Sequence, residues 1–488
     1  MTHNPNPFDF VSFGKEVIVR SLAEWSAVGE TTYSGYLEVD LKTLTPLHIS
    51  GRQDAASGMD GKKIGKSFFY RQGENLPCIP GSSIKGMLRS FIEALTGGWV
   101  SQVTPTYEKL EGKRHIGFSV FDEYSDYRNR KSPQAVPSKF RPVGLPERAD
   151  LATFMFGFVE EATNGSTSKA LKGRIGVEDA FIAPDQLETR KLPDIEGDAF
   201  MGGPHPCASS WWYMSPREIW NRRAAQHQVA EFVGRSFRGR KFYFHQDPGE
   251  CLLWYDKNWK KENQVQKKDK TIVEPPYYTY DVEALKTNAI ASFRISIKEL
   301  PEPLLALFCL CLNPGQTIRH KLGYGKAYGF GSVEFSISSA KLRRDYSGEW
   351  PAPLTNHKDK LQSIIQNAWD EGNLKMLGID AFVDRTSLNK LAQILGWSDN
   401  DDITFTYPPF NRQNFARPIT FVEACEAAKI CGLAATGDKI VVQIKDETKP
   451  VNKGGEVAEG LFDKKRTIAL LAYQLKSNGW DTIKKRKP

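Results

Sequence analysis

The sequence lacks the features that would mark a zinc, secreted or membrane protein. Its seven cysteines form no C-x-x-C pair, and no group of cysteine and histidine has the spacing of a zinc site. No apolar run approaches the length that spans a bilayer, and the first residues, Met1 to Pro5, contain no apolar signal core. No repeat of fixed period recurs along the chain. We therefore expect a cytoplasmic protein with reduced thiols and no membrane contact.

The chain has little excess charge for its length, but the excess is positive. Among 488 residues there are 66 lysines and arginines and 58 aspartates and glutamates, so the formal net charge is +8. A basic excess favours an anionic partner such as a nucleic acid. The composition, 40% hydrophobic and 25% charged, is that of a globular protein long enough for two or three domains.

The stretch IPGSSIKGMLRS predicts a strand end, a tight turn and the start of a helix. Pro80 and Gly81 favour the turn, and Ser82 or Ser83 is suited to cap the helix. Apolar residues then recur at helical spacing from Ile84 to Leu95.

Two cations, Lys85 and Arg89, lie one turn apart on another face of this helix. Free N–H groups, the positive end of the helix dipole and nearby cations together favour an anion, and we expect a nucleic-acid phosphate. The alternative is an ordinary capped amphipathic helix with surface cations.

A second glycine-rich stretch, RHKLGYGKAYGFG at residues 319–331, precedes a strand. It lacks the acidic residue that follows a dinucleotide fingerprint, and its place before a strand also argues against a nucleotide cofactor. Arg319, His320, Lys321 and Lys326 place cations beside glycines, which suits a phosphate backbone. The alternative is a tight turn whose glycines serve only its geometry.

The order of the predicted elements indicates an α+β fold. Strands are expected at 36–47, 173–183, 291–297 and 332–337, and helices at 84–95 and 301–312. Strand–helix–strand, repeated once, is the order of a ferredoxin-like sheet with helices on one face. We expect a polar lead-in at 1–34, the ferredoxin-like core at 35–337 with insertions at about 100–148 and 186–288, and a separate, mainly helical domain at 338–488.

Several motifs, taken together and in order, resemble a known family. IPGSSIKGMLRS and the later HKLGYGKAYGFGSV resemble the signature pair of the RAMP superfamily of CRISPR-associated proteins, and DLATFMFG with GRIGVEDAFI resembles the segment between them. LKTLTPLHISG resembles the first strand of the backbone-forming, Cas-seven-type subunits of type III effector complexes, and FRGRKFYFH a motif of one long-chain branch. The resemblance covers residues 36–337 and leaves the C-terminal part outside.

The resemblance implies an RRM-related, ferredoxin-like core that holds guide RNA (crRNA) and positions single-stranded target RNA, beside other RAMP and Cas subunits, in antiviral defence. Such domains read RNA by shape, phosphate contacts and stacking. The insertion would supply a thumb-like hairpin, and its aromatic and basic residues between Trp211 and Lys270 suit stacking or, alternatively, a local core. The implied RNA-binding residues are His48, Ser82, Ser83, Lys85, Arg89, Arg238, Arg240, Lys241, His320, Lys321, Gly323, Gly325, Lys326, Gly329 and Gly331.

The resemblance also raises the question of catalysis, because backbone subunits often cut target RNA with a loop aspartate and a divalent metal. The corresponding loop begins at Arg52; Asp60 lies nearest the expected place, and Asp54 is the second candidate. Asp60 would hold Mg²⁺ or Mn²⁺. The residues around Asp60 depart from the family's sequence pattern, and Lys62 and Lys63 follow it. The alternative is that this is a solvated loop without a catalytic role.

Four functions compete at this point. The first is a guide-binding backbone subunit that also cleaves target RNA, and the second is the same subunit as a non-catalytic structural or capping segment. The third is a metal-independent ribonuclease that processes guide RNA, with His48 or His320 as general acid or base. The fourth is a protein-interaction module whose basic face is incidental.

Overall fold

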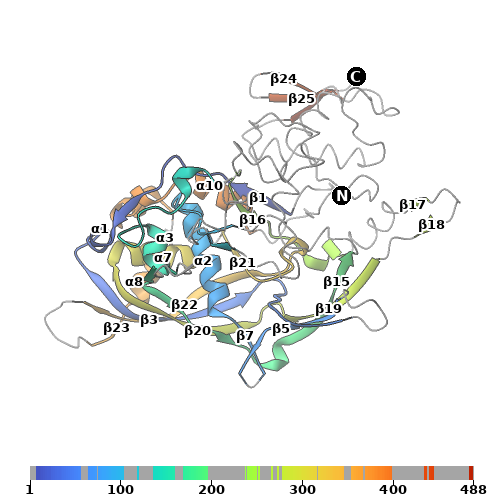
Figure 1. Cartoon of the computed structure of the whole chain (residues 1–488), viewed down its shortest axis with the longest axis horizontal. Coiled ribbons are helices and arrows are strands. Elements are labelled where there is room, and N and C mark those ends of the chain that lie inside the picture. Colours follow the sequence, from blue (N-terminus) through green and yellow to red (C-terminus); the bar gives the residue numbers. More distant parts are fainter. Residues whose placement is uncertain are drawn as a thin grey trace.

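The computed structural model describes most of the first 397 residues and short strands beyond them. The described ranges are 7–55, 64–73, 75–103, 118–119, 136–159, 169–195, 237, 239–249, 251–252, 265–266, 272–273, 277–315, 317–345, 353–366, 369–397, 433–436, 439–443 and 483–486. In these ranges, a layer of helices lies over one face of an antiparallel sheet (Figure 1).

The main sheet has its first strand at its centre. Its strands are β3 (Thr32–Thr43), β13 (Ile175–Val177), β20 (Ile290–Pro301), β21 (His320–Lys321), β22 (Ser332–Arg344) and β23 (Thr355–Asn356). They lie in the order β13-β20-β3-β22-β21, with β23 added to β22, and every pair is antiparallel. Helix α2 (Gly81–Leu95) connects β3 towards β13, and α7 (Glu302–Leu312) connects β20 towards β22. This is the predicted ferredoxin-like order.

The helices pack on the sheet through a continuous hydrophobic core. Every residue of α7 from Leu304 to Leu312 is buried, because α7 lies between the sheet and α8 (Lys358–Gln366). Helix α3 (Leu151–Phe156) is buried along its whole length beside α2. Burying one such leucine or phenylalanine contributes about 1.5–3 kcal/mol, so this layer holds the fold together.

A second sheet extends from the end of the first (Figure 1). Its order is β15 (Leu187–Ile195), β19 (Tyr277–Leu285), β5 (Ile64–Phe69) and β4 (Ser50–Ala55). Strands β15 and β19 form the base of the predicted insertion, and β4 and β5 form a hairpin where the sequence predicted only a loop. The hairpin that carries the loop aspartates therefore lies against the base of the insertion.

The segment at 1–34 was predicted to be a polar lead-in, but its described residues contribute to the hydrophobic core. Strand β1 (Phe8–Val11) is wholly buried and pairs with β16 (Arg240–Tyr243). Trp25 of α1 (Leu22–Ser26) is fully buried, and its Nε1 donates to the Ala149 carbonyl oxygen at 2.7 Å. Helix α1 has only five residues, which is too short for its apolar periodicity to predict this packing from the sequence.

The helices after the sheet share its core, which differs from the expected separate domain at 338–488. Helices α8, α9 (Glu371–Met376) and α10 (Arg385–Ile394) place residues such as Leu361 and Leu391 in the same hydrophobic cluster as the sheet. The expected boundary at 337 falls inside β22. The helices predicted after residue 398 lie outside the described residues.

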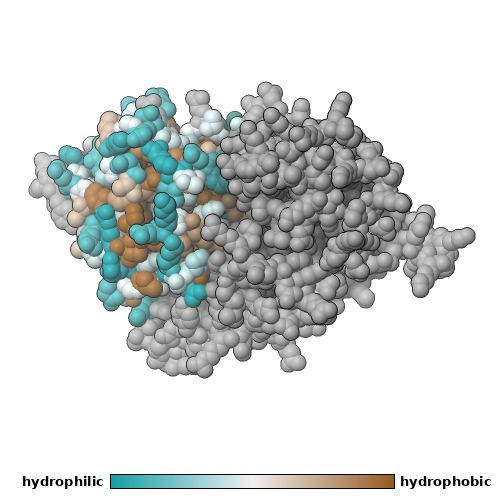
Figure 2. All heavy atoms as spheres, turned by 90° about the horizontal axis from the view of Figure 1, so that it is seen from above, coloured by the Kyte–Doolittle hydropathy of each residue, from teal (hydrophilic) through white to brown (hydrophobic). Residues whose placement is uncertain are grey.

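Seen from the helix side, the described surface is mostly hydrophilic with small hydrophobic areas between (Figure 2). No helix in the described ranges is both long and apolar enough to cross a membrane.

The remaining strands are short. They are β2 (Val19–Ser21), β6 (Arg71–Gln72), β7 (Leu76–Ile79), β8 (Gln102–Val103), β9 (Phe118–Ser119), β10 (Arg148–Asp150), β11 (Gly157–Val159), β12 (Ala170–Lys172), β14 (Ala180–Phe181), β17 (Val265–Gln266), β18 (Ile272–Val273), β24 (Leu433–Thr436), β25 (Lys439–Gln443) and β26 (Ile483–Arg486).

Candidate nucleic-acid interface

The start of α2 is organised by a glycine and a distant carboxylate. Pro80 is the N-cap and makes no side-chain cap hydrogen bond, so the prediction that Ser82 or Ser83 caps the helix is wrong. The Gly81 N–H donates to the Asp179 carboxylate at 2.6 Å. A Cβ at Gly81 would lie 2.1 Å from a carbonyl oxygen of β13, so only glycine allows this close start. Both serines remain at least partly exposed, and their contact with RNA stays a prediction.

The two cations of α2 have different surroundings. Arg89 pairs through Nε with Glu93 at 2.8 Å and donates to the Gly157 carbonyl oxygen at 2.7 Å and to Thr153 Oγ1 at 3.3 Å. It therefore joins α2 to α3, which corrects its assignment as a phosphate ligand. Lys85 is half-buried, and its pKa is lowered by desolvation and then by the charge of Arg89. Within the described ranges it forms no ion pair, so it is the cation of this motif that is open to a phosphate.

The glycine loop at 319–331 is a turn whose backbone packs against the protein itself. A Cβ at Gly331 would lie 1.9 Å from the Leu322 carbonyl oxygen, and one at Gly323 would lie 2.4 Å from that of His48. These glycines are therefore required by the turn, and their approach to an RNA backbone stays a prediction. Positive φ angles occur at Gly323 (79°), Gly325 (75°), Gly329 (90°) and Gly331 (78°).

The lysines of the glycine loop hold the turn from inside. Lys321 is 8% exposed, and its Nζ donates to the carbonyl oxygens of Gly329 and Phe330 at 3.0 Å each. Burial lowers the pKa of Lys321 well below its usual value. Lys326 donates to the Gly323 carbonyl oxygen, and burial also lowers its pKa. Lys321 thus holds the turn through internal hydrogen bonds, and the prediction that it contacts RNA directly is wrong.

His320 is buried beside the helix layer. It is 2% exposed, its Nε2 bonds the Cys311 carbonyl oxygen at 2.9 Å, and its ring packs against Phe91 of α2 at 5.0 Å between centroids. Burial lowers its pKa to about 4, so the ring is neutral at pH 7. A neutral, buried ring reaches no RNA, which removes it both as an RNA ligand and as a general acid or base.

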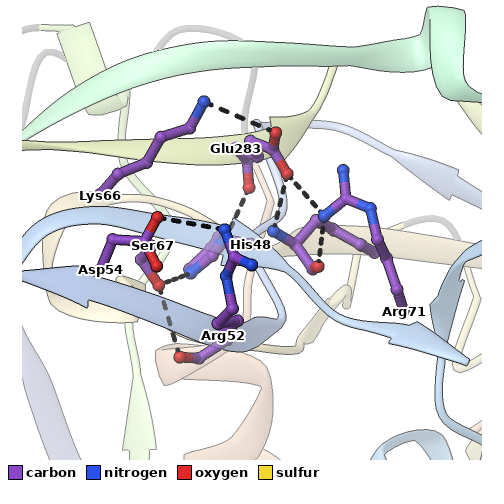
Figure 3. A network of polar contacts seen from close by, with 9 residues as sticks. His48, Arg52, Asp54, Lys66, Ser67, Arg71 and Glu283 are labelled. Atoms are coloured by element: carbon purple, nitrogen blue, oxygen red, sulfur yellow. Dashed lines mark hydrogen bonds and ion pairs between the residues drawn. The ribbon is translucent and has the colours of Figure 1, made fainter. Parts of the chain in front are cut away.

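His48 lies just after β3 and connects it to three other segments, of which β19 and β5 are seen in Figure 3. Its Nδ1 donates to the Glu283 carbonyl oxygen of β19 at 2.6 Å, and its Nε2 accepts from the Ser67 hydroxyl of β5 at 3.0 Å. Its own carbonyl oxygen accepts from the N–H of Tyr324 in the glycine loop at 2.8 Å. The ring is fully buried and burial lowers its pKa, so His48 is a neutral connector, not the predicted RNA ligand or general base.

Glu283 is a central residue that sequence reasoning did not identify. Its carboxylate pairs with Arg71 at 2.8 Å and with Lys66 at 3.7 Å, and it accepts from the Phe69 N–H at 3.1 Å (Figure 3). Burial raises the pKa of Glu283, but the hydrogen bonds from Arg71 and Phe69 together lower it by more, so the net shift is downward. Local sequence pattern gives no signal for it, because Glu283 lies on the strand face opposite to the buried Val282 and Ala284.

The loop aspartates do not assemble a metal site in the described residues. Asp54 of β4 pairs with Arg52 at 3.1 Å and lies opposite Lys66 in the hairpin. The Asp54 carboxylate is thus already neutralised by a cation, and no cluster of three metal-binding side chains occurs in the described ranges. Asp60 lies outside the described residues.

Part of the FRGRKFYFH stretch, Arg240–Tyr243, forms β16, and His245 after it contacts the glycine loop through the Arg319 carbonyl oxygen at 3.2 Å. Arg240 is directed inward: it donates to the Gly98 carbonyl oxygen, and burial lowers its pKa. Lys241 lies 3.8 Å from the ring centre of Phe8. After the strand, His245 bonds Ser332 Oγ at 2.8 Å. Arg238 lies outside the described residues.

Comparison with known families agrees with this geometry. A family model described as the RAMP superfamily matches residues 40–334, more than half of the chain. The chain belongs to the RAMP superfamily. It is therefore a CRISPR-associated protein with a role in RNA binding, and RAMP proteins generally work in multi-subunit CRISPR complexes. No curated protein matches the chain.

Proposed function

We propose that this RAMP protein is a Cas-seven-type backbone subunit of a type III CRISPR effector complex and binds guide RNA. The observation that carries the proposal is the junction at His48, where the end of β3, the β4–β5 hairpin, the base of the insertion and the glycine loop meet. All four segments lie in the region matched by the family. Such a junction brings the segments that the resemblance assigns to RNA to one end of the sheet.

Binding of guide RNA is tested with the full-length chain. We expect fluorescence anisotropy to show binding of a labelled single-stranded RNA that weakens as salt rises, because phosphate neutralisation releases counterions. Single-stranded DNA of the same sequence should bind more weakly, because it lacks the 2′-hydroxyl. A full-length chain that binds neither RNA nor partner RAMP subunits would contradict the proposal.

We further propose that the loop at 56–63 cuts target RNA through Asp60 and a divalent metal, Mg²⁺ or Mn²⁺. When bound, such an ion would stabilise charge on the leaving oxygen. In the assembled complex, Asp60→Ala should remove one band from the ladder of cut target RNA while guide binding persists. Asp54→Ala is the matched control: it should leave the ladder intact, because Asp54 is paired with Arg52.

The second candidate is a non-catalytic structural or capping subunit of the same complex. It is favoured by the ion pair between Asp54 and Arg52, which already engages one of the two candidate carboxylates. An unchanged ladder in both aspartate variants would select it. The guide-processing ribonuclease is not supported, since both of its candidate histidines are buried.

A further inference from the structure

Phe68 on the β4–β5 hairpin is surrounded by three cations. Its ring centre lies 4.6 Å from Lys66 Nζ, 4.7 Å from the Arg52 guanidinium carbon and 6.0 Å from that of Arg71. The ring is partly exposed, whereas its neighbours Ser67 and Phe69 are each 1% exposed. Since side chains alternate along a strand, Lys66 and Phe68 share the face opposite to the buried His48 junction.

A β-bulge aims one of these cations at the ring. Ser50 pairs with Phe69 and Gln53 with Ser67, so Gly51 and Arg52 together oppose the single residue Phe68. A Cβ at Gly51 would lie 2.9 Å from the Phe69 carbonyl oxygen, so glycine is needed for the bulge to close.

The cations are held by carboxylates on one side. Arg52 pairs with Asp54, while Lys66 and Arg71 share Glu283 (Figure 3). Three positive charges thus face two negative ones. The Arg52 side chain is 73% exposed and that of Lys66 is 37% exposed, so both keep donors towards solvent.

We propose that this face is a stacking site for one nucleobase of the target RNA, with Phe68 as the stacking ring and Arg52 and Lys66 as contacts to the adjoining phosphates. Aromatic rings and guanidinium planes are the groups on which unpaired RNA bases stack. The target strand is the ligand, because β4 and β5 run directly into the loop at 56–63. This inference rests on the proposed RNA-binding function and adds a base-holding residue beside the loop.

The affinity test uses the full-length chain loaded with guide RNA and a labelled complementary target. Phe68→Leu keeps an apolar side chain without a π-face and should weaken target binding by roughly tenfold, whereas Phe68→Tyr should bind as the wild type does. Tyr36→Leu is the matched control, because Tyr36 also lies on a strand under an arginine, with Arg294 4.9 Å from its ring, but on the main sheet. Guide affinity should be unchanged in all three variants.

A direct readout is photocrosslinking of target RNA that carries 5-iodouridine at successive positions, followed by mass spectrometry. A crosslink at Phe68, lost in Phe68→Leu, supports the stacking site. Equal target affinity of Phe68→Leu and wild type, or crosslinks only at other residues, overturns it and leaves guide binding standing. Failure of the wild-type chain to bind any guide RNA overturns the proposed function as well.

Discussion

The open face of the main sheet and the end of that sheet around His48 are built from different chemistry. On the open face, several polar side chains are already paired: Ser292 Oγ donates to Asp40 at 2.6 Å, and Arg294 pairs with Glu38 at 3.2 Å. Its aromatic residue among the described strands is Tyr36, with Arg294 over the ring. No described segment covers this face.

At the His48 end, the polar groups are inside and the backbone is constrained. His48, Lys321 and Glu283 each hold a turn or strand through hydrogen bonds, and four glycines adopt positive φ. A fully satisfied buried polar network fixes one arrangement of its segments. The constrained backbone and the buried polar contacts are therefore found at the His48 end of the sheet. The open face offers little for the stacking of bases on sheet aromatics that RRM domains use.

The largest effect expected from this contrast is at Gly331. Gly331→Ala combines a positive φ with a Cβ 1.9 Å from the Leu322 carbonyl oxygen, so it should lower the free energy of unfolding by more than about 2 kcal/mol and abolish guide binding. Gly378→Ala is the control, since Gly378 has a φ of 69° but nothing within 4 Å of its Cβ position. It should cost only about 1 kcal/mol. Urea unfolding measures both, and equal losses would remove the steric argument.

The contrast also explains what the sequence could predict. Periodicity located α2, α7 and β20, because their apolar positions follow the packing of one face or of a whole buried element. The paired glycine motifs predicted the right turns, because positive φ and close backbone approach leave few other residues possible.

The functions of single polar residues could not be predicted in the same way. Arg89 and Lys321 carry the same charge whether they contact a phosphate or a carbonyl oxygen, and only the fold shows that their donors are used internally. Glu283 lies more than two hundred positions from Phe69, the residue whose N–H it accepts, so no local pattern links them. The long-range partners of charged side chains therefore could not be predicted from the sequence.

The second prediction separates an internal cation from an exposed one. Lys321→Met removes two hydrogen bonds that hold the glycine loop and should weaken guide RNA binding roughly thirtyfold, because each bond contributes about 1 kcal/mol and about 1.4 kcal/mol corresponds to a factor of ten. The slope of log affinity against log salt should stay unchanged. Lys85→Met should instead reduce that slope by about 0.7, the value for one phosphate contact on a single strand. Anisotropy titrations at several salt concentrations measure both quantities.

These two lysines test the assignment in opposite directions. A reduced slope for Lys321→Met would mean that its ammonium faces a phosphate, contrary to its two carbonyl partners. An unchanged slope for Lys85→Met would move the phosphate contact away from the start of α2. Thermal unfolding of Lys85→Met, which breaks no described ion pair, should match that of the wild type.

The smallest effect is expected on the open face. The double change Tyr36→Leu and Arg294→Gln removes its aromatic ring and the cation above it, and should alter guide and target affinity by less than about twofold. The free energy of unfolding should fall by less than about 1 kcal/mol, since an exposed cross-strand ion pair contributes little. The same anisotropy titrations check the affinities. A loss of tenfold or more would show that RNA stacks on the sheet as in an RRM, because removing one base–aromatic contact costs that much. The His48 end would then be a scaffold for loops, and the sheet itself would be the surface that reads RNA.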